Sequence, residues 1–104
     1  MKKIINGKRY DTETATRIEN WWNRLSNSDF NHCEETLYKT KNGNYFIHGS
    51  GGPFTNYSVP VGNNSYGGST QIRPLTKKEV YEWCEEHNLT DTIEKEFADM
   101  IADA

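Results

Sequence analysis

The alternation of apolar and polar positions predicts β-strands over the first two-thirds of the chain. Two runs carry this pattern most clearly, residues 34–40 and residues 44–48, and both are rich in aromatic and β-branched side chains. Lys41-Asn42-Gly43 between them has the composition of a hairpin turn. A second hairpin is expected at residues 3–10, because Asn6-Gly7 supplies the two positive-φ positions of a type I′ turn. Residues 71–73 are expected to form a last short strand.

Residues 12–22 fit both a strand and a helix. β-Branched side chains at every second position favour a strand: Thr12, Thr14, Thr16 and Ile18. The spacing of Ala15, Ile18 and Trp22 favours a helix. We favour the strand. In a strand Trp21 and Trp22 face opposite sides, so at most one ring can enter a thin core and an exposed Trp22 becomes a candidate partner anchor.

Two glycine-rich segments are expected to interrupt the strands. Residues 49–53 (Gly-Ser-Gly-Gly-Pro) should break the ladder, because Pro53 has no amide hydrogen to donate and the glycines permit a sharp bend. This segment lacks the Gly-Lys-Ser/Thr ending and the following helix of a phosphate-binding loop, so we interpret it as a bend between strands. Residues 62–69 are expected to form a second, flexible loop.

The last third of the chain changes to a helical period. Thr76 and Glu79 form a capping box, and a second capping box is expected from Asp91 to Glu94. The first helix has one apolar face, made of Val80, Trp83, Cys84 and His87, and Asn88 is expected to cap its end. The second has a buried stripe of Ile93, Phe97, Met100 and Ile101. The fold class is therefore α+β, a small antiparallel sheet of hairpins packed with two C-terminal α-helices, in a single domain spanning residues 1–104.

Composition limits the class of protein. The chain has 104 residues, of which 34% are hydrophobic, so a few large aromatic side chains must supply much of the core. No apolar run approaches the roughly 20 residues needed to cross a bilayer, and the N-terminus lacks the apolar segment of a signal peptide. We therefore expect no membrane contact, and reduced cysteines in a cytoplasm.

Charge is distributed unevenly. Residues 1–78 contain eleven Lys/Arg and six Asp/Glu, whereas residues 79–104 contain one Lys and nine Asp/Glu. The acidic helices either present ordinary solvated faces or dock on a basic, nucleic-acid-binding protein. In the second interpretation Glu85, Glu86 and Glu94 are candidate partner contacts. Direct nucleic-acid binding is not expected, because no basic stripe with interleaved aromatic residues is present.

Two constellations could carry chemistry. Cys84 and His87, at Cys-x-x-His spacing on one helical face, could join His32 and Cys33 as the four ligands of a structural Zn²⁺. The usual Cys-x-x-Cys half is missing, and the alternative is that Cys84 lies in the core and His32 in an exposed turn. A cysteine nucleophile at Cys33, paired with His48 or His87, is disfavoured because neighbouring Glu side chains would raise the thiol pKa. We expect no catalytic activity.

Four blocks of the chain together carry a resemblance: residues 3–15, residues 35–38, residues 43–53 with Gly51-Gly52-Pro53, and residues 74–87 with Trp83-Cys84-Glu85-Glu86-His87. This combination resembles a family of small phage and mobile-element proteins of Gram-positive bacteria. Proteins of this size and origin include type II-A anti-CRISPR proteins, so the resemblance implies an anti-defence role. Cys84 departs from that family, in which an aliphatic residue is common, and this argues against a family-wide zinc site.

These observations lead to two functional hypotheses. The first is a binding protein that inhibits a host defence nuclease, Cas9 or its guide-RNA complex, in the cytoplasm of a bacterial host cell. Its contacts would be the acidic helices and an exposed Trp22. The alternative is a small zinc-stabilised accessory or regulatory protein of a mobile element.

Overall fold

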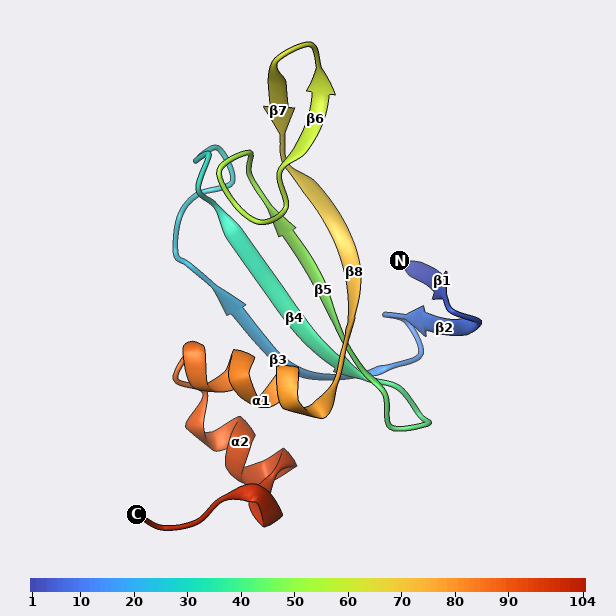
Figure 1. The fold of residues 1–104 in the computed structure, drawn as a ribbon, viewed down its shortest axis with the longest axis vertical. Coiled ribbons are helices and arrows are strands. Elements are labelled where there is room, and N and C mark those ends of the chain that lie inside the picture. Colours follow the sequence, from blue (N-terminus) through green and yellow to red (C-terminus); the bar gives the residue numbers. More distant parts are fainter.

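A four-stranded antiparallel sheet in the order β3-β4-β5-β8 forms the centre of the molecule (Figure 1). The computed structural model describes residues 1–104, and the strands of this sheet are β3 (Thr16–Trp22), β4 (Cys33–Lys39), β5 (Tyr45–Gly51) and β8 (Ser69–Leu75). Strands β3, β4 and β5 form a meander, and β8 pairs with the remaining edge of β5. The α+β fold class is confirmed, and residues 16–22 form the strand that we favoured.

Two further hairpins lie outside this sheet. The first joins β1 (Lys2–Ile5) to β2 (Lys8–Asp11), and Asn6 and Gly7 at its turn have φ angles of 50° and 78°, as predicted. The second joins β6 (Val59–Gly62) to β7 (Ser65–Gly67) and projects from the end of the sheet opposite the helices (Figure 1). The expected flexible loop over residues 62–69 is therefore wrong, because Asn64, with a φ of 59°, closes a hairpin turn.

The expected break at residues 49–53 is also wrong in part. Strand β5 continues to Gly51, and Gly49 and Gly51 pair with Gln71 and Ser69 of β8. Because Gly49 and Gly51 have no side chains, they leave room beside β5 for the side chain of Tyr57.

Two helices follow the sheet: α1 (Lys77–Glu86) and α2 (Thr90–Glu96), with a short 3₁₀ helix η1 (Ala98–Met100) after them. The first capping box is confirmed, because Thr76 Oγ1 accepts from the Glu79 amide at 3.2 Å and Glu79 Oε1 accepts from the Thr76 amide at 2.9 Å. Asn88, with a φ of 56°, lies one position beyond the C-cap residue His87. No helix has the length and apolar character required to cross a membrane.

The second predicted capping box is wrong. Helix α2 begins at Thr90, after an N-cap residue, Leu89, that makes no side-chain capping bond, so Asp91 lies inside the first turn. The predicted buried stripe is also shorter than expected. Phe97 is buried, but Met100 and Ile101 are 51% and 40% exposed because the α-helix has already ended at Glu96.

The core lies on both faces of the sheet. The helices cover one face, where the buried side chains are Leu37, Tyr45, Ile47, Val80, Trp83, Cys84 and Phe97. The β1–β2 hairpin covers part of the other face, where Tyr10 packs on Phe46 and Ile72. Both helices lie toward one end of the sheet (Figure 1), and the loop after β5, which carries the fully buried Tyr57, packs on the same face beside Gly49 and Gly51.

Candidate functional site

A buried carboxylate, Glu35, lies on the helix-covered face of the sheet, between α1 and the loop after β5. Strand alternation directs Cys33, Glu35 and Leu37 toward the helices, while Glu34 points to the opposite face. Glu35 is only 5% exposed. A carboxylate so well removed from water requires donors to balance its charge.

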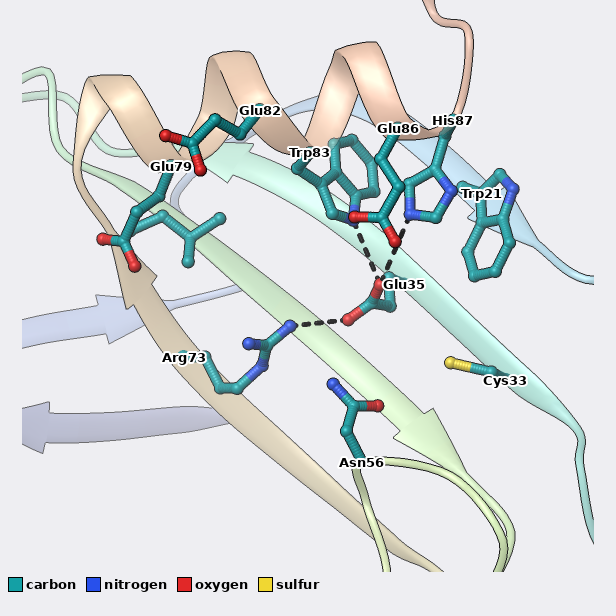
Figure 2. A pocket seen from close by; sticks show the side chains of 11 residues that line it. Trp21, Cys33, Glu35, Asn56, Arg73, Glu79, Glu82, Trp83, Glu86 and His87 are labelled. Carbon is teal, nitrogen blue, oxygen red and sulfur yellow. Dashed lines mark hydrogen bonds and ion pairs between the residues drawn. The ribbon is translucent and has the colours of Figure 1, made fainter.

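Three side chains donate hydrogen bonds to Glu35, and a fourth lies nearby. Figure 2 shows the contacts that Arg73, Trp83 and His87 make with this carboxylate. The Tyr57 hydroxyl and Arg73 Nη2 donate to Oε2, the latter at 2.6 Å. Trp83 Nε1 donates to Oε1 at 3.0 Å, and His87 Nε2 lies 3.9 Å from the same oxygen. These donors come from the loop after β5, from β8 and from α1, so the carboxylate links three parts of the fold.

Tyr57 reaches Glu35 because β5 carries glycine beside it. Tyr57 is fully buried, and a Cβ added at Gly49 would overlap its hydroxyl, while one at Gly51 would crowd Thr55 and the Tyr57 ring. Burial, and then the hydrogen bond to Glu35, raises the pKa of Tyr57. The hydroxyl therefore stays protonated and keeps its role as a donor.

A cavity of about 400 Å³ opens above this network. Its lining residues are Trp21, Cys33, Glu35, Asn56, Arg73, Leu75, Glu79, Glu82, Trp83, Glu86 and His87. One wall is aromatic, since the Trp21 and His87 rings stack with centroids 3.8 Å apart and 21° between planes. Trp83 meets His87 edge to face at 5.2 Å. The carboxylates on α1 form another wall (Figure 2).

Cys33 borders the cavity but is not set up as a nucleophile. Burial, and then the neighbouring Glu35 carboxylate, raises the pKa of its thiol to about 11, so the reactive thiolate is scarce at neutral pH. His48 cannot act as its base, because β5 directs His48 to the opposite face of the sheet, the same side as Phe46.

The four predicted zinc ligands do not form one site. Cys84 is fully buried in the apolar core beneath the helices, and His32 Nδ1 is hydrogen-bonded to the Leu25 carbonyl at 2.9 Å. Cys33 and His87 share the cavity, but no group of three or more His, Cys, Asp and Glu side chains has an arrangement that could hold a metal ion. The zinc hypothesis fails here because Cys84, on the apolar face of α1, faces the core.

The predicted partner contacts lie on two different surfaces. Trp21 faces the helices and Trp22, 48% exposed, faces the other side of the sheet, as the strand interpretation required. Glu85, Glu86 and Glu94 are exposed on α1 and α2. Trp22 and the three glutamates are therefore separated by the sheet and do not form one continuous surface.

Sequence reasoning missed Glu35, Arg73 and Tyr57 as members of a site. A signal was present for the first two, because each is a charged residue at an inward-facing register position of a predicted strand. Tyr57 lies outside any predicted strand, and nothing in the sequence places it beside Gly49.

The comparisons with known proteins add nothing to this geometry. No family model, no curated protein and no solved structure matches the chain.

Proposed function

We propose that this chain is a mobile-element binding protein that inhibits Cas9 in the cytoplasm of a bacterial host cell. It acts by docking an acidic helix surface on a basic, nucleic-acid-binding surface of the nuclease. The choice of Cas9 rests on the sequence resemblance. The mode of binding rests on the distribution of charge.

The observation that carries the proposal is an acidic surface whose carboxylates form no ion pairs. We define the acidic helix surface as Glu79, Glu82, Glu85, Glu86, Asp91, Glu94 and Asp99, all of which are exposed. The ion pairs of the structure involve other carboxylates, Glu35 and Glu96. The two helices carry three lysines, Lys77, Lys78 and Lys95, against the seven carboxylates of this surface, so their net charge remains negative.

Such a surface favours encounter with a positively charged protein. Uncompensated charge of one sign accelerates association with a complementary surface and repels nucleic acid. A nuclease groove that binds nucleic-acid phosphates presents that complementary charge.

The chemistry around Glu35 supports binding over catalysis. Both oxygens of Glu35 are already occupied by donors, and the thiol of Cys33 is held protonated. Neither group is free to act as a base or a nucleophile at neutral pH.

The test is cleavage of target DNA by a purified Cas9–guide-RNA complex, with and without this protein. The charge-reversal variant Glu85→Lys/Glu94→Lys changes two residues that lie outside the cavity. Its inhibition constant is expected to rise roughly tenfold or more, because each reversal replaces an attraction by a repulsion at the rim of the interface.

The matched control is Glu13→Lys/Glu34→Lys, which makes the same change in net charge at two exposed positions away from the helices. The control variant should inhibit as well as the parent, and inhibition by the parent should weaken as salt increases. Unchanged cleavage in the presence of the parent protein rejects Cas9 as the target. Equal losses in both variants reject the helices as the docking surface.

A further inference from the structure

The cavity above Glu35 has a composition that selects for one kind of ligand. It combines aromatic rings on one side, carboxylates on another, and a floor whose own charges are already paired (Figure 2). We propose that it binds the guanidinium group of an arginine residue in a peptide segment of the partner. The identity of the partner rests on the proposed function, but the chemistry of the cavity does not.

The charge of the cavity favours a cation. Glu79, Glu82 and Glu86 project from α1 at spacings of three and four residues, which places them along one side of the helix. Glu82 and Glu86 have no ion-pair partner. The backbone amide of Thr76 donates to Glu79, and this hydrogen bond lowers the pKa of Glu79 and keeps it ionised.

Anions are disfavoured for the same reason. Arg73 is the one lysine or arginine that lines the cavity, and its guanidinium is already bound to Glu35 at 2.6 Å. A phosphate or carboxylate ligand would meet three unpaired carboxylates and find no free positive charge. The cavity is therefore unsuited to a nucleotide.

The aromatic walls favour guanidinium over ammonium. The Trp21 and His87 rings are stacked, and Trp83 meets His87 at 79°, so two indoles and an imidazole stand around one space. A planar guanidinium stacks on aromatic faces and binds carboxylates through two parallel hydrogen bonds. Lysine presents a compact, strongly hydrated charge and uses this arrangement less well.

One unused donor points to a peptide as the carrier of the arginine. Arg73 Nε is buried and has no hydrogen-bond partner. A buried donor without an acceptor is costly, and a small shift of the partly exposed Arg73 side chain would present Nε to a main-chain carbonyl next to the bound arginine. A free metal ion or a simple amine could not.

The experiment is a fluorescence titration with two peptides, acetyl-Gly-Gly-Arg-Gly-Gly-amide and the same peptide with lysine in place of arginine. Two of the three tryptophans, Trp21 and Trp83, line the cavity, whereas Trp22 lies on the opposite face. The Trp22→Phe variant therefore provides a background in which the remaining emission reports on the cavity. We expect a saturable change with the arginine peptide and affinity for the lysine peptide roughly tenfold weaker.

Two variants with equal net charge separate the cavity from the general acidic field. In the Trp22→Phe background, Glu82→Gln/Glu86→Gln removes two cavity carboxylates, and Asp91→Asn/Glu94→Gln removes two carboxylates from α2 outside it. All four positions are exposed, so both variants should fold, as circular dichroism can verify. The first should lose at least about 90% of the binding, equivalent to a tenfold change, and the second less than half.

Failure of this inference can be distinguished from failure of the proposed function. Saturable binding of the arginine peptide with the expected variant pattern supports the cavity even if Cas9 is not inhibited. No saturable change with the arginine peptide, equal binding of the two peptides, or equal losses in the two variants overturns it, even if Cas9 is inhibited.

Discussion

The helix-covered face of the sheet has two halves, and the side chains that β4 and β5 direct toward the helices differ between them. In the closed half, beneath α1 and α2, β4 contributes Leu37 and β5 contributes Ile47, both fully buried against Val80 and Cys84. In the open half, two residues earlier along β4, the inward side chain is Glu35. The closed half is continuous apolar packing, whereas the open half is a charged network beside a cavity of about 400 Å³.

The two halves therefore contribute differently to stability. Burial of apolar side chains in the closed half stabilises the fold directly. In the open half the attraction between Glu35 and Arg73 must first offset the cost of removing both charges from water. Well-packed apolar residues often replace a buried ion pair without loss of stability, so the open half is better explained by recognition than by folding. Mutations can test that interpretation.

The largest expected effect is that of Glu35→Leu. This change leaves Arg73, Tyr57 and Trp83 without their shared acceptor inside a partly closed site. We expect the free energy of unfolding to fall by about 3 kcal/mol, the lower end of the range for breaking a buried pair, because Arg73 remains partly exposed. Urea-induced unfolding followed by fluorescence measures this loss.

The double variant Glu35→Leu/Arg73→Met tests why stability is lost. Removing both charges together should restore about half of the loss or more, because the remaining cost is that of the Tyr57 and Trp83 donors alone. If the double variant is less stable than Glu35→Leu, the open half contributes to folding as the closed half does, and our distinction between the two is incorrect.

The closed half could be predicted from the sequence and the open half could not, for a physical reason. Leu37 and Ile47 are apolar residues at alternating strand positions, and Val80 and Cys84 share one face of a helix, so periodicity identifies them. Glu35 also fits the alternation, but a carboxylate at an inward position is interpretable only once its donors are known. Those donors come from three separate parts of the chain, and no local pattern connects them.

The helix ends also show that a local sequence pattern is not always enough to predict the structure. The box at Thr76 and Glu79 forms as predicted, because the helix that follows has an apolar face that binds the sheet. The equivalent pattern at Asp91 and Glu94 does not form a cap. The chain leaves α1 at Asn88 with a positive φ, and α2 begins immediately afterwards at Thr90. The tight turn between the helices decided the boundary, and the side-chain pattern did not.

An intermediate effect on stability is expected at Gly49, where the absence of a side chain on β5 makes room for Tyr57. In Gly49→Ala the new methyl group overlaps the Tyr57 hydroxyl, so the ring must move away from Glu35. We expect a loss of about 1–3 kcal/mol, typical of overpacking, measured by urea-induced unfolding. Gly62→Ala is the matched control, because its added Cβ meets no atom within 4 Å, and it should change stability little. Equal effects of the two changes would mean that Gly49 is not needed to admit Tyr57.

The smallest expected effect on stability comes from ionisation of the two cysteines, one in each half. Burial raises the pKa of both the Cys33 and the Cys84 thiol to about 11 from 9.0, with Glu35 as the next cause for Cys33 and Glu19 for Cys84. Because the folded-state pKa values are raised, this contribution to stability is complete below pH 9 and is lost as the pH rises toward 11. The loss should reach about 1 kcal/mol for each thiol near pH 10, seen as lower urea midpoints.

Alkylation at pH 8 should then distinguish the two halves, with mass spectrometry reporting which thiol has reacted. The Cys33 thiol should react roughly a hundredfold more slowly than in urea-unfolded protein, since its pKa is raised by about two units. Cys33 borders the cavity and should be modified in the native state, whereas Cys84 is fully buried and should react only through unfolding. Adding the stabiliser sucrose should therefore slow modification of Cys84 more than that of Cys33. If Cys84 reacts first, the half that we describe as closed is open in solution.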